Sequence, residues 1–216
     1  MIFGTYTKRI ITSGFLLSLV FLIFNYKYIL IYSLIIFSVL SLLEFANIIK
    51  KIFIKKFYFY SLNLIFILYI FLFSFFFVYF ASFLQLKIIL FSLLGCCIAS
   101  DIGGFIFGKF FKGPKLTKIS PNKTYAGSIG SLIFSCLVIS MAMYSYTKIF
   151  TIDFLIVGFF TSLACQAGDL FFSFLKRKSK IKDTGNFLPG HGGIIDRVDG
   201  ILLGVPFGFI VLISLY

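Results

Sequence analysis

Acidic side chains are scarce in this sequence, and three aspartates stand where a divalent cation could be bound. Asp169 lies near the end of one apolar segment, and Asp196 and Asp199 stand at the start of the next. Residues three apart on a helix share a face, so these carboxylates can converge from two helix ends. Magnesium is usually held by one or two carboxylates with water and substrate phosphates. The spacing therefore permits a magnesium site, and structural salt bridges with nearby basic residues are the alternative.

A glycine-rich turn comes immediately before the last apolar segment. Gly190, Gly192 and Gly193 form it, and Pro189 stiffens the approach. Exposed backbone N–H groups and the positive end of a helix dipole bind anions at such a place, although a plain turn between helices would have the same composition. His191, the one histidine of the chain, can donate a hydrogen bond to a phosphate oxygen there. The turn is therefore a candidate phosphate-binding loop.

Two basic stretches are further candidates for phosphate binding. They are residues 173–183 (SFLKRKSKIKD) and residues 107–127, and their candidate residues are Lys176, Arg177, Lys182, Ser120, Lys123 and Thr124. A basic run at a helix end is usually a topology determinant or a contact to lipid headgroups, and the second stretch does not match a P-loop. Two such stretches on one side of a membrane nevertheless indicate that several phosphates are held there.

The segments that must position these groups are typical of an integral membrane protein. The chain has 216 residues, of which 60% are hydrophobic and 12% charged, and its mean hydropathy is +1.08. Soluble domains average about 25% charged residues, and about 20 apolar residues are enough to cross a bilayer. We expect an all-α, polytopic helical bundle with about seven transmembrane helices, over 10–25, 28–46, 57–80, 88–107, 127–147, 152–173 and 194–216.

Basic residues are distributed unequally between the two ends of these spans. Most of the 20 Lys and Arg residues fall on the side of the N-terminus, and the connections on the other side contain Lys27, Lys87 and Lys148. The positive-inside rule therefore predicts a cytoplasmic N-terminus, in a multi-pass protein of the inner membrane whose active site faces the cytoplasm. The net charge of +13 is explained by topology, so we expect membrane lipids and no nucleic acid as partners.

Short connections between the spans predict one membrane-embedded domain over 1–216. Its N-terminal helices cover roughly 1–85 and its catalytic half roughly 88–216. The four cysteines lie in apolar runs without zinc-type spacing to the histidine, so we expect reduced packing residues. The sequence GSIGS at 127–131 offers small residues for close helix contact, either inside the chain or in a homodimer.

The ordered pattern S-x-x-K-R-x-x-x-x-K-D-x-G-x-x-x-P-G-H-G-G-x-x-D-R-x-D, from Ser173 to Asp199, resembles the signature of the phosphatidate cytidylyltransferases, or CDP-diacylglycerol synthases. Three more points are similar to that family: GDL at 168–170, the acidic-aromatic pair Glu44–Phe45, and a looser pattern that runs from Asp101 to 120–124. The resemblance covers about the C-terminal half of the chain and one early point.

This resemblance implies a Mg²⁺-dependent enzyme that joins CTP and phosphatidic acid into CDP-diacylglycerol and pyrophosphate. The metal would be held by Asp169, Asp196 and Asp199. The catalytic set that it implies is Asp169, Asp196, Asp199, Lys182, Asp183, His191 and Arg197. The implied substrate-binding set is Asp101, Ser120, Lys123, Thr124, Ser173, Lys176, Arg177, Gly190, Gly192 and Gly193.

Three residues depart from the family pattern, and two other functions share some of its features. The departures are Phe172, Ala126 and Gly200, where the family commonly has acidic, amide or hydroxyl side chains. A related CTP-dependent polyprenol or phytol kinase would share the site and transfer the γ-phosphate instead. An ion-coupled transporter would place its charged residues near the bilayer midplane and often show inverted repeats. Here the charges gather at one edge and no repeat is visible, which disfavours the transporter.

Overall fold

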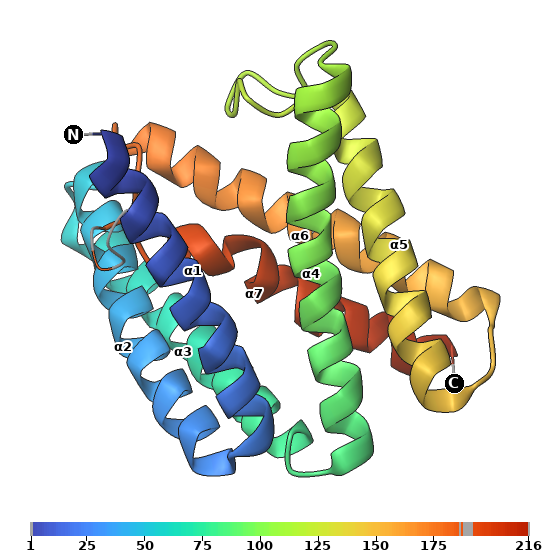
Figure 1. The fold of residues 1–216 in the computed structure, drawn as a ribbon. Coiled ribbons are helices and arrows are strands. Elements are labelled where there is room, and N and C mark those ends of the chain that lie inside the picture. Colours follow the sequence, from blue (N-terminus) through green and yellow to red (C-terminus); the bar gives the residue numbers. More distant parts are fainter. Residues whose placement is uncertain (1, 186, 188–191, 216) are drawn as a thin grey trace. The chain divides into compact units, whose positions relative to one another are not determined.

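The described residues form seven α-helices and no assigned β-strand. In this computed structural model the described residues are 2–185, 187 and 192–215, and for 2–11 and 13 only the backbone is described. The helices (Figure 1) are α1 (Ile2–Asn25), α2 (Lys27–Ile52), α3 (Lys56–Phe80), α4 (Leu84–Phe111), α5 (Tyr125–Thr147), α6 (Ile152–Lys178) and α7 (Ile195–Leu215). The all-α prediction is confirmed. Several helices continue a turn or more beyond the predicted spans, because polar residues at a span's end can extend the same helix.

Six helices, α2 to α7, are long and apolar enough to cross a membrane, as judged on the described residues. In α1 the described apolar stretch is Gly14–Asn25, which is shorter than a full span. Large apolar side chains such as Phe71, Leu72 and Phe75 on α3 are more than half exposed, as expected of surfaces that face lipid. The chain is therefore an integral membrane protein, and the seventh span stays a prediction.

Two compact units make up the chain. Unit 1 comprises Met1–Ser82 and Leu175–Val198, and unit 2 comprises Phe83–Phe174 and Asp199–Tyr216. In unit 1, α2 lies beside α1 and α3 (Figure 1). The rings of Phe45 and Phe66 stack there, with centroids 3.9 Å apart. The prediction of one functional domain over the whole chain is not tested by this division.

Small residues bring α4 and α5 together in unit 2 (Figure 1). A Cβ atom added to Gly130 would stand 2.7 Å from the carbonyl oxygen of Gly103, so only glycine allows this approach. The Oγ of Ser131 donates a hydrogen bond of 2.7 Å to the carbonyl oxygen of Ser100. The GSIGS stretch is thus used inside the chain, and it gives no support to a homodimer.

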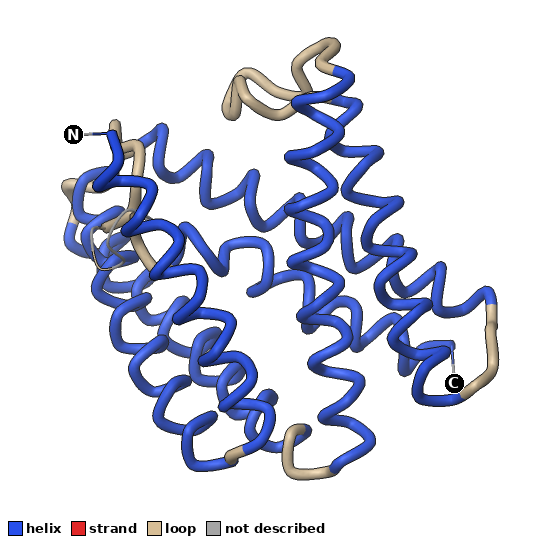
Figure 2. The backbone as a smooth tube through the Cα atoms, viewed as in Figure 1, coloured by secondary structure: helices blue, strands red, loops and turns tan. Residues whose placement is uncertain are grey.

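The connection between α4 and α5 is one of the loops drawn in Figure 2. α4 ends where Lys112 and Gly113 adopt positive φ angles of 50° and 97°. Thr124 then starts α5 as its N-cap, because its Oγ1 accepts a hydrogen bond of 3.1 Å from the backbone N–H of Gly127. Such a cap satisfies one of the N–H groups that a helix start leaves unpaired. The loop therefore enters α5 in a fixed direction, with Lys123 directly before the cap.

Candidate functional site

An ion pair joins the α4–α5 loop to α6 within unit 2. The Nζ atom of Lys123 pairs with Oδ2 of Asp169. The loop fixes the backbone of Lys123, because its carbonyl accepts from the N–H of Leu116 at 2.8 Å and its own N–H donates to the carbonyl of Ser120 at 3.1 Å. The side chains of Lys123 and Asp169 are 26% and 29% exposed. The pair thus joins the pattern at 120–124 to the GDL motif at 168–170, and it stays accessible from outside the protein.

The turn of α6 that carries Asp169 packs directly on α7. A Cβ atom on Gly168 would stand 2.5 Å from the carbonyl oxygen of Asp199, so the helices touch backbone to backbone. The carboxylate of Asp199 is buried and accepts a hydrogen bond of 3.0 Å from the N–H of Gly200. The Oγ of Ser173 lies 3.5 Å from Oδ1 of Asp169, at the long limit of a hydrogen bond. Asp169, Ser173 and Asp199 are therefore on neighbouring helix turns.

A second ion pair lies in unit 1. The Nζ atom of Lys176 is 2.7 Å from Oδ1 of Asp196, and the two side chains are only 13% and 7% exposed. The other oxygen, Oδ2, accepts from the backbone N–H groups of Thr184 at 2.8 Å and Gly193 at 3.0 Å. Asp196 therefore ties together the end of α6, the following loop and the start of α7.

The backbone at the end of α6 places Lys176 for this contact. The N–H of Ile181 donates to the carbonyl of Lys176 at 3.0 Å, and Lys180 adopts a left-handed φ of 56°. This is the usual way in which a helix ends and its last carbonyls find donors. Beyond Lys176, Lys178 points to the ring of Phe53, with Nζ 5.2 Å from the centroid.

One face of α6 carries three of the predicted residues. Asp169, Ser173 and Lys176 follow at i, i+4 and i+7 of a single helix, a spacing that puts them on the same side. Each of the two ion pairs takes one member from this face. Lys123, which pairs with Asp169 of this face, can exchange that partner for a phosphate oxygen because the pair is accessible.

The backbone N–H groups at the start of α7 donate to carboxylates of the chain itself. Those of Ile194 and Ile195 donate to Oε1 and Oε2 of Glu44, each at 2.9 Å, and that of Gly193 donates to Asp196. Of the glycines predicted to contact phosphate, Gly193 therefore has its N–H group bound to a carboxylate of the chain in this structure. Glu44 was predicted as a point of family resemblance, and its sequence signal was an acidic residue at the end of an apolar span.

The other predicted residues fall into three groups. Gly190 and His191 lie outside the described residues, so their roles stay predictions. Gly192 has a φ of 82°, which favours glycine, and Ser120 and Thr124 shape their loop through the hydrogen bonds given above. Side chains that the structure leaves exposed are those of Asp101, Arg177, Lys182, Asp183 and Arg197. Their roles in substrate binding stay predictions.

The carboxylates fit a magnesium ion that takes most of its ligands from water and substrate. No group of three or more His, Cys, Asp or Glu side chains placed to hold a metal occurs in residues 2–185, 187 and 192–215. Magnesium requires fewer, and the accessible carboxylate of Asp169 offers hard oxygen ligands. Asp196 has Oδ1 on Lys176 and Oδ2 on the loop. Asp169 and Asp196 belong to different units, so a metal shared by both stays a prediction.

A polar network that the sequence analysis missed supports the position of Asp169. Gln166, three residues earlier on α6, accepts from Ser128 Oγ at 2.5 Å and donates to Ser162 Oγ at 3.2 Å. Ser162 in turn lies 2.9 Å, Oγ to Oγ, from Ser100. The network links α4, α5 and α6. Its sequence signal was a set of small polar residues inside apolar spans, where each must find a hydrogen-bond partner.

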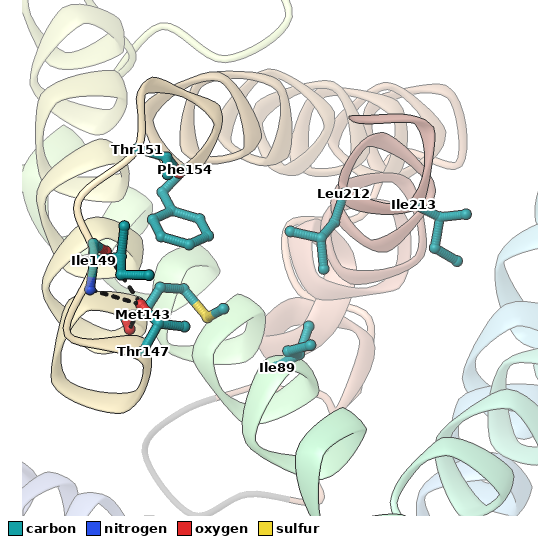
Figure 3. Close-up of a pocket in the computed structure, with 8 residues that line it drawn as sticks. All are labelled: Ile89, Met143, Thr147, Ile149, Thr151, Phe154, Leu212 and Ile213. Carbon is teal, nitrogen blue, oxygen red and sulfur yellow. Dashed lines mark hydrogen bonds between the residues drawn. The ribbon is translucent and has the colours of Figure 1, made fainter. Parts of the chain in front are cut away.

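Two cavities in unit 2 differ in character. The larger, of about 460 Å³, is apolar and is lined by Ile89, Met143, Thr147, Ile149, Thr151, Phe154, Leu212 and Ile213 (Figure 3). It lies at the C-terminal end of α5, roughly 30 Å along this helix from Lys123 at 1.5 Å per residue. The smaller, of about 390 Å³, is lined by Lys115, Leu116, Thr117, Lys118 and Pro121 of the loop that holds Lys123. The smaller cavity, which is basic, belongs with the candidate site.

One departure from the family pattern has a packing reason. A Cβ atom on Gly200 would stand 2.5 Å from Sγ and 3.1 Å from the carbonyl oxygen of Cys165 on α6. A serine at this position would therefore need a smaller neighbour. Phe172 is buried, at 4% exposure, and Ala126 lies half-buried in the first turn of α5. Neither of these two supplies a ligand.

The sequence is similar to those of known cytidylyltransferases. The model of the cytidylyltransferase family matches residues 9–215. The chain is 40% identical over 129 residues to the phosphatidate cytidylyltransferase of Rickettsia felis, which is 55% of this chain and 57% of that protein. It is 42% identical over 113 residues to that of Helicobacter pylori strain J99 (52% and 42%), and 40% identical over 140 residues to that of Mycobacterium leprae (57% and 42%). The matched regions thus span about half the length of these relatives. Since the family model covers almost every residue, the chain belongs to the cytidylyltransferase family.

Proposed function

We propose that this protein transfers CMP from CTP to phosphatidic acid, giving CDP-diacylglycerol and pyrophosphate in phospholipid biosynthesis. Membership of the family and the names of three relatives support the proposal. The structural observation that carries it is the face of α6 on which Asp169, Ser173 and Lys176 alternate acidic, hydroxyl and basic groups. Such a face suits two phosphate-bearing substrates and a cation.

The reaction needs neutralisation of charge more than a protein nucleophile. An oxygen of the lipid phosphate forms a bond to the α-phosphorus of CTP. The bond from that phosphorus to the oxygen bridging to the β-phosphate breaks, and pyrophosphate leaves with the electron pair. Because both reactants are anions, cations must offset their repulsion and the charge of the leaving group.

Of the lysines in the two ion pairs, Lys123 is the one available for this task. Lys123 gives up Asp169 and binds a phosphate oxygen when substrate enters, because this pair is accessible and weakly held. Arg177 and Lys182, exposed near the end of α6, extend the cationic surface. The basic cavity beside Lys123 adds Lys115 and Lys118.

Asp169 and Asp196, with Asp199 in support, would hold Mg²⁺, which supplies neutralisation of triphosphate charge when it is bound. The carboxylate of Asp169 is oriented for this by Ser173 and Lys123. Both basic stretches face the cytoplasm in the proposed topology, where CTP is present, because Lys and Arg gather on that side. A homodimer stays a prediction.

The test uses purified protein in detergent with phosphatidic acid, Mg²⁺ and CTP labelled either in the cytidine or in the γ-phosphate. We expect the cytidine label in the lipid fraction and equimolar release of pyrophosphate. The γ-label alone in lipid would instead identify a lipid kinase. No label in lipid from either form of CTP, with protein shown to be folded, would contradict the proposal. Diacylglycerol in place of phosphatidic acid is the matched control, because it lacks the attacking phosphate.

A further inference from the structure

Glu44 is a buried carboxylate that the proposed reaction does not use. It lies on α2 and is 1% exposed. Oε1 accepts from the N–H of Ile194 at 2.9 Å, and Oε2 accepts from the N–H of Ile195 at 2.9 Å and from Oγ1 of Thr184 at 2.7 Å. Burying an ionised carboxylate is costly unless donors surround it. Here three donors and the positive end of the α7 dipole do so.

The sequence around this carboxylate is adapted to its close approach. A Cβ atom on Gly185 or on Gly193 would stand 2.6 Å from Oε1 of Glu44. Any larger residue at either position would push the carboxylate away from the N–H groups that it accepts from. Both ends of the segment 184–195 are therefore held against the same side chain.

The contact continues from Glu44 to the second ion pair. The hydroxyl of Thr184 lies between the two carboxylates, 2.7 Å from Oε2 of Glu44 and 3.1 Å from Oδ2 of Asp196. Asp196 receives the backbone N–H of Thr184 on that same oxygen and holds Lys176 with the other. All of these residues belong to unit 1. A displacement of Glu44 would consequently reach Asp196 and Lys176 through one hydroxyl.

We propose that Glu44 is a positioning residue: from α2 it caps the start of α7 and, through Thr184, sets the orientation of Asp196 and Lys176. Because Glu44 is 1% exposed and its oxygens accept from the chain itself, we expect it to contact neither substrate nor metal. A cap supplied by another helix does what an N-cap side chain does locally, and it also holds the first turn of α7 against α2 within unit 1. The effect on turnover rests on the proposed function, whereas the effect on the loop does not.

The test compares Glu44→Gln with wild type by hydrogen exchange and by turnover. A glutamine keeps the size but turns one acceptor into a donor that faces N–H groups. We expect at least tenfold faster exchange in peptides covering 179–196, unchanged exchange in the α2–α3 peptides, and about a 100-fold lower kcat, as a displacement of about 1 Å can cause, with a smaller change in KM. The matched control is Ser41→Ala on the same helix, since Ser41 is equally buried and its Oγ has no hydrogen-bond partner among the described residues. It should behave as wild type.

A second pair of variants keeps the test decisive if Glu44→Gln does not fold. Thr184→Val removes the hydroxyl that links the carboxylates, and Thr184→Ser retains it. Faster exchange and lower kcat in the valine variant, with recovery in the serine variant, would support the proposal. Equal behaviour of the two, or protection and kcat at wild-type values in Glu44→Gln, would overturn it. If wild type forms no CDP-diacylglycerol while the exchange results hold, the proposed function fails and the role of Glu44 in holding the loop stands.

Discussion

The two Lys–Asp pairs differ in burial, and this difference predicts different costs for the loss of each lysine. In the pair of Lys176 with Asp196 the side chains are 13% and 7% exposed, and in that of Lys123 with Asp169 they are 26% and 29% exposed. Removing one partner of a buried pair leaves an uncompensated charge, which costs about 3–5 kcal/mol. Accessible pairs contribute only about 0–1 kcal/mol. Lys176→Met should therefore be far more destabilising than Lys123→Met.

Thermal unfolding in detergent measures this difference. A chain of this size shifts its Tm by about 2–4 °C per kcal/mol, so Lys176→Met should lower Tm by at least about 6 °C and Lys123→Met by less than about 4 °C. The chain has no tryptophan. Cys96, Cys97 and Cys165 are free and buried, however, so a thiol-reactive dye reports when the helices separate.

The double variant Lys176→Met with Asp196→Asn is the control for the mechanism. If the cost comes from an uncompensated carboxylate, removing that charge should restore part of the lost Tm. A double variant no more stable than Lys176→Met would show that lost packing, not charge, is responsible. Equal shifts for Lys123→Met and Lys176→Met would refute the reasoning from burial altogether.

Three further predictions concern activity and packing. Asp196→Asn should lower formation of labelled lipid by at least about 100-fold with normal membrane insertion. Lys180→Ala should remain close to wild type, because Lys180 is exposed and is not among the residues proposed to bind phosphate; an equally severe loss in Lys180→Ala would show that Lys180 belongs to that set. Gly200→Ser should lower the free energy of unfolding by about 1–3 kcal/mol, because its Cβ would stand 2.5 Å from Sγ of Cys165. Adding Cys165→Ala to this variant should recover part of the decrease in Tm. Chelation of divalent cations should stop product formation, and added Mg²⁺ should restore it. Turnover that persists in the presence of chelator would show that the reaction does not need the metal.

The helices could be predicted because the bilayer leaves the backbone little choice. An apolar run of about 20 residues must satisfy its own N–H and C=O groups, and a helix does so. The residues at which the helices end were harder to predict from the sequence. α4 continues to Phe111 and α6 to Lys178, because Lys109 and Lys176 are polar residues that still favour helix. Hydropathy marks where the chain leaves lipid, which is not where a helix must stop.

The partners of the charged residues could not be predicted in the same way. Spacing left open whether the aspartates bind a metal or form salt bridges, and the structure gives two of them a lysine partner. Lys123 reaches Asp169 from the loop between α4 and α5, two helices that approach closely at Gly103 and Gly130. A sequence shows that small residues are present, but it does not show which helix they face.

The role of Glu44 was hidden for another reason. Its partners are mainly backbone N–H groups, which every residue except proline has. No pattern of side chains in the sequence therefore predicts these contacts. A lone acid at the end of a span looks the same whether it binds a metal or caps a distant helix. Only the fold distinguishes the two, because it brings α2 against the start of α7 within unit 1.

Burial also separates the tasks of the two pairs. Asp196 is held by Lys176, Thr184 and Gly193 at once, so releasing it would disturb the loop as well as the ion pair. Asp169 pairs with Lys123 and makes a long contact to Ser173, and it can exchange Lys123 for other charges at small cost. We therefore expect Lys123 to move onto phosphate during turnover while Lys176 keeps Asp196 in place. Substitution of Lys123 should then act mainly on kcat and KM, and that of Lys176 on stability first.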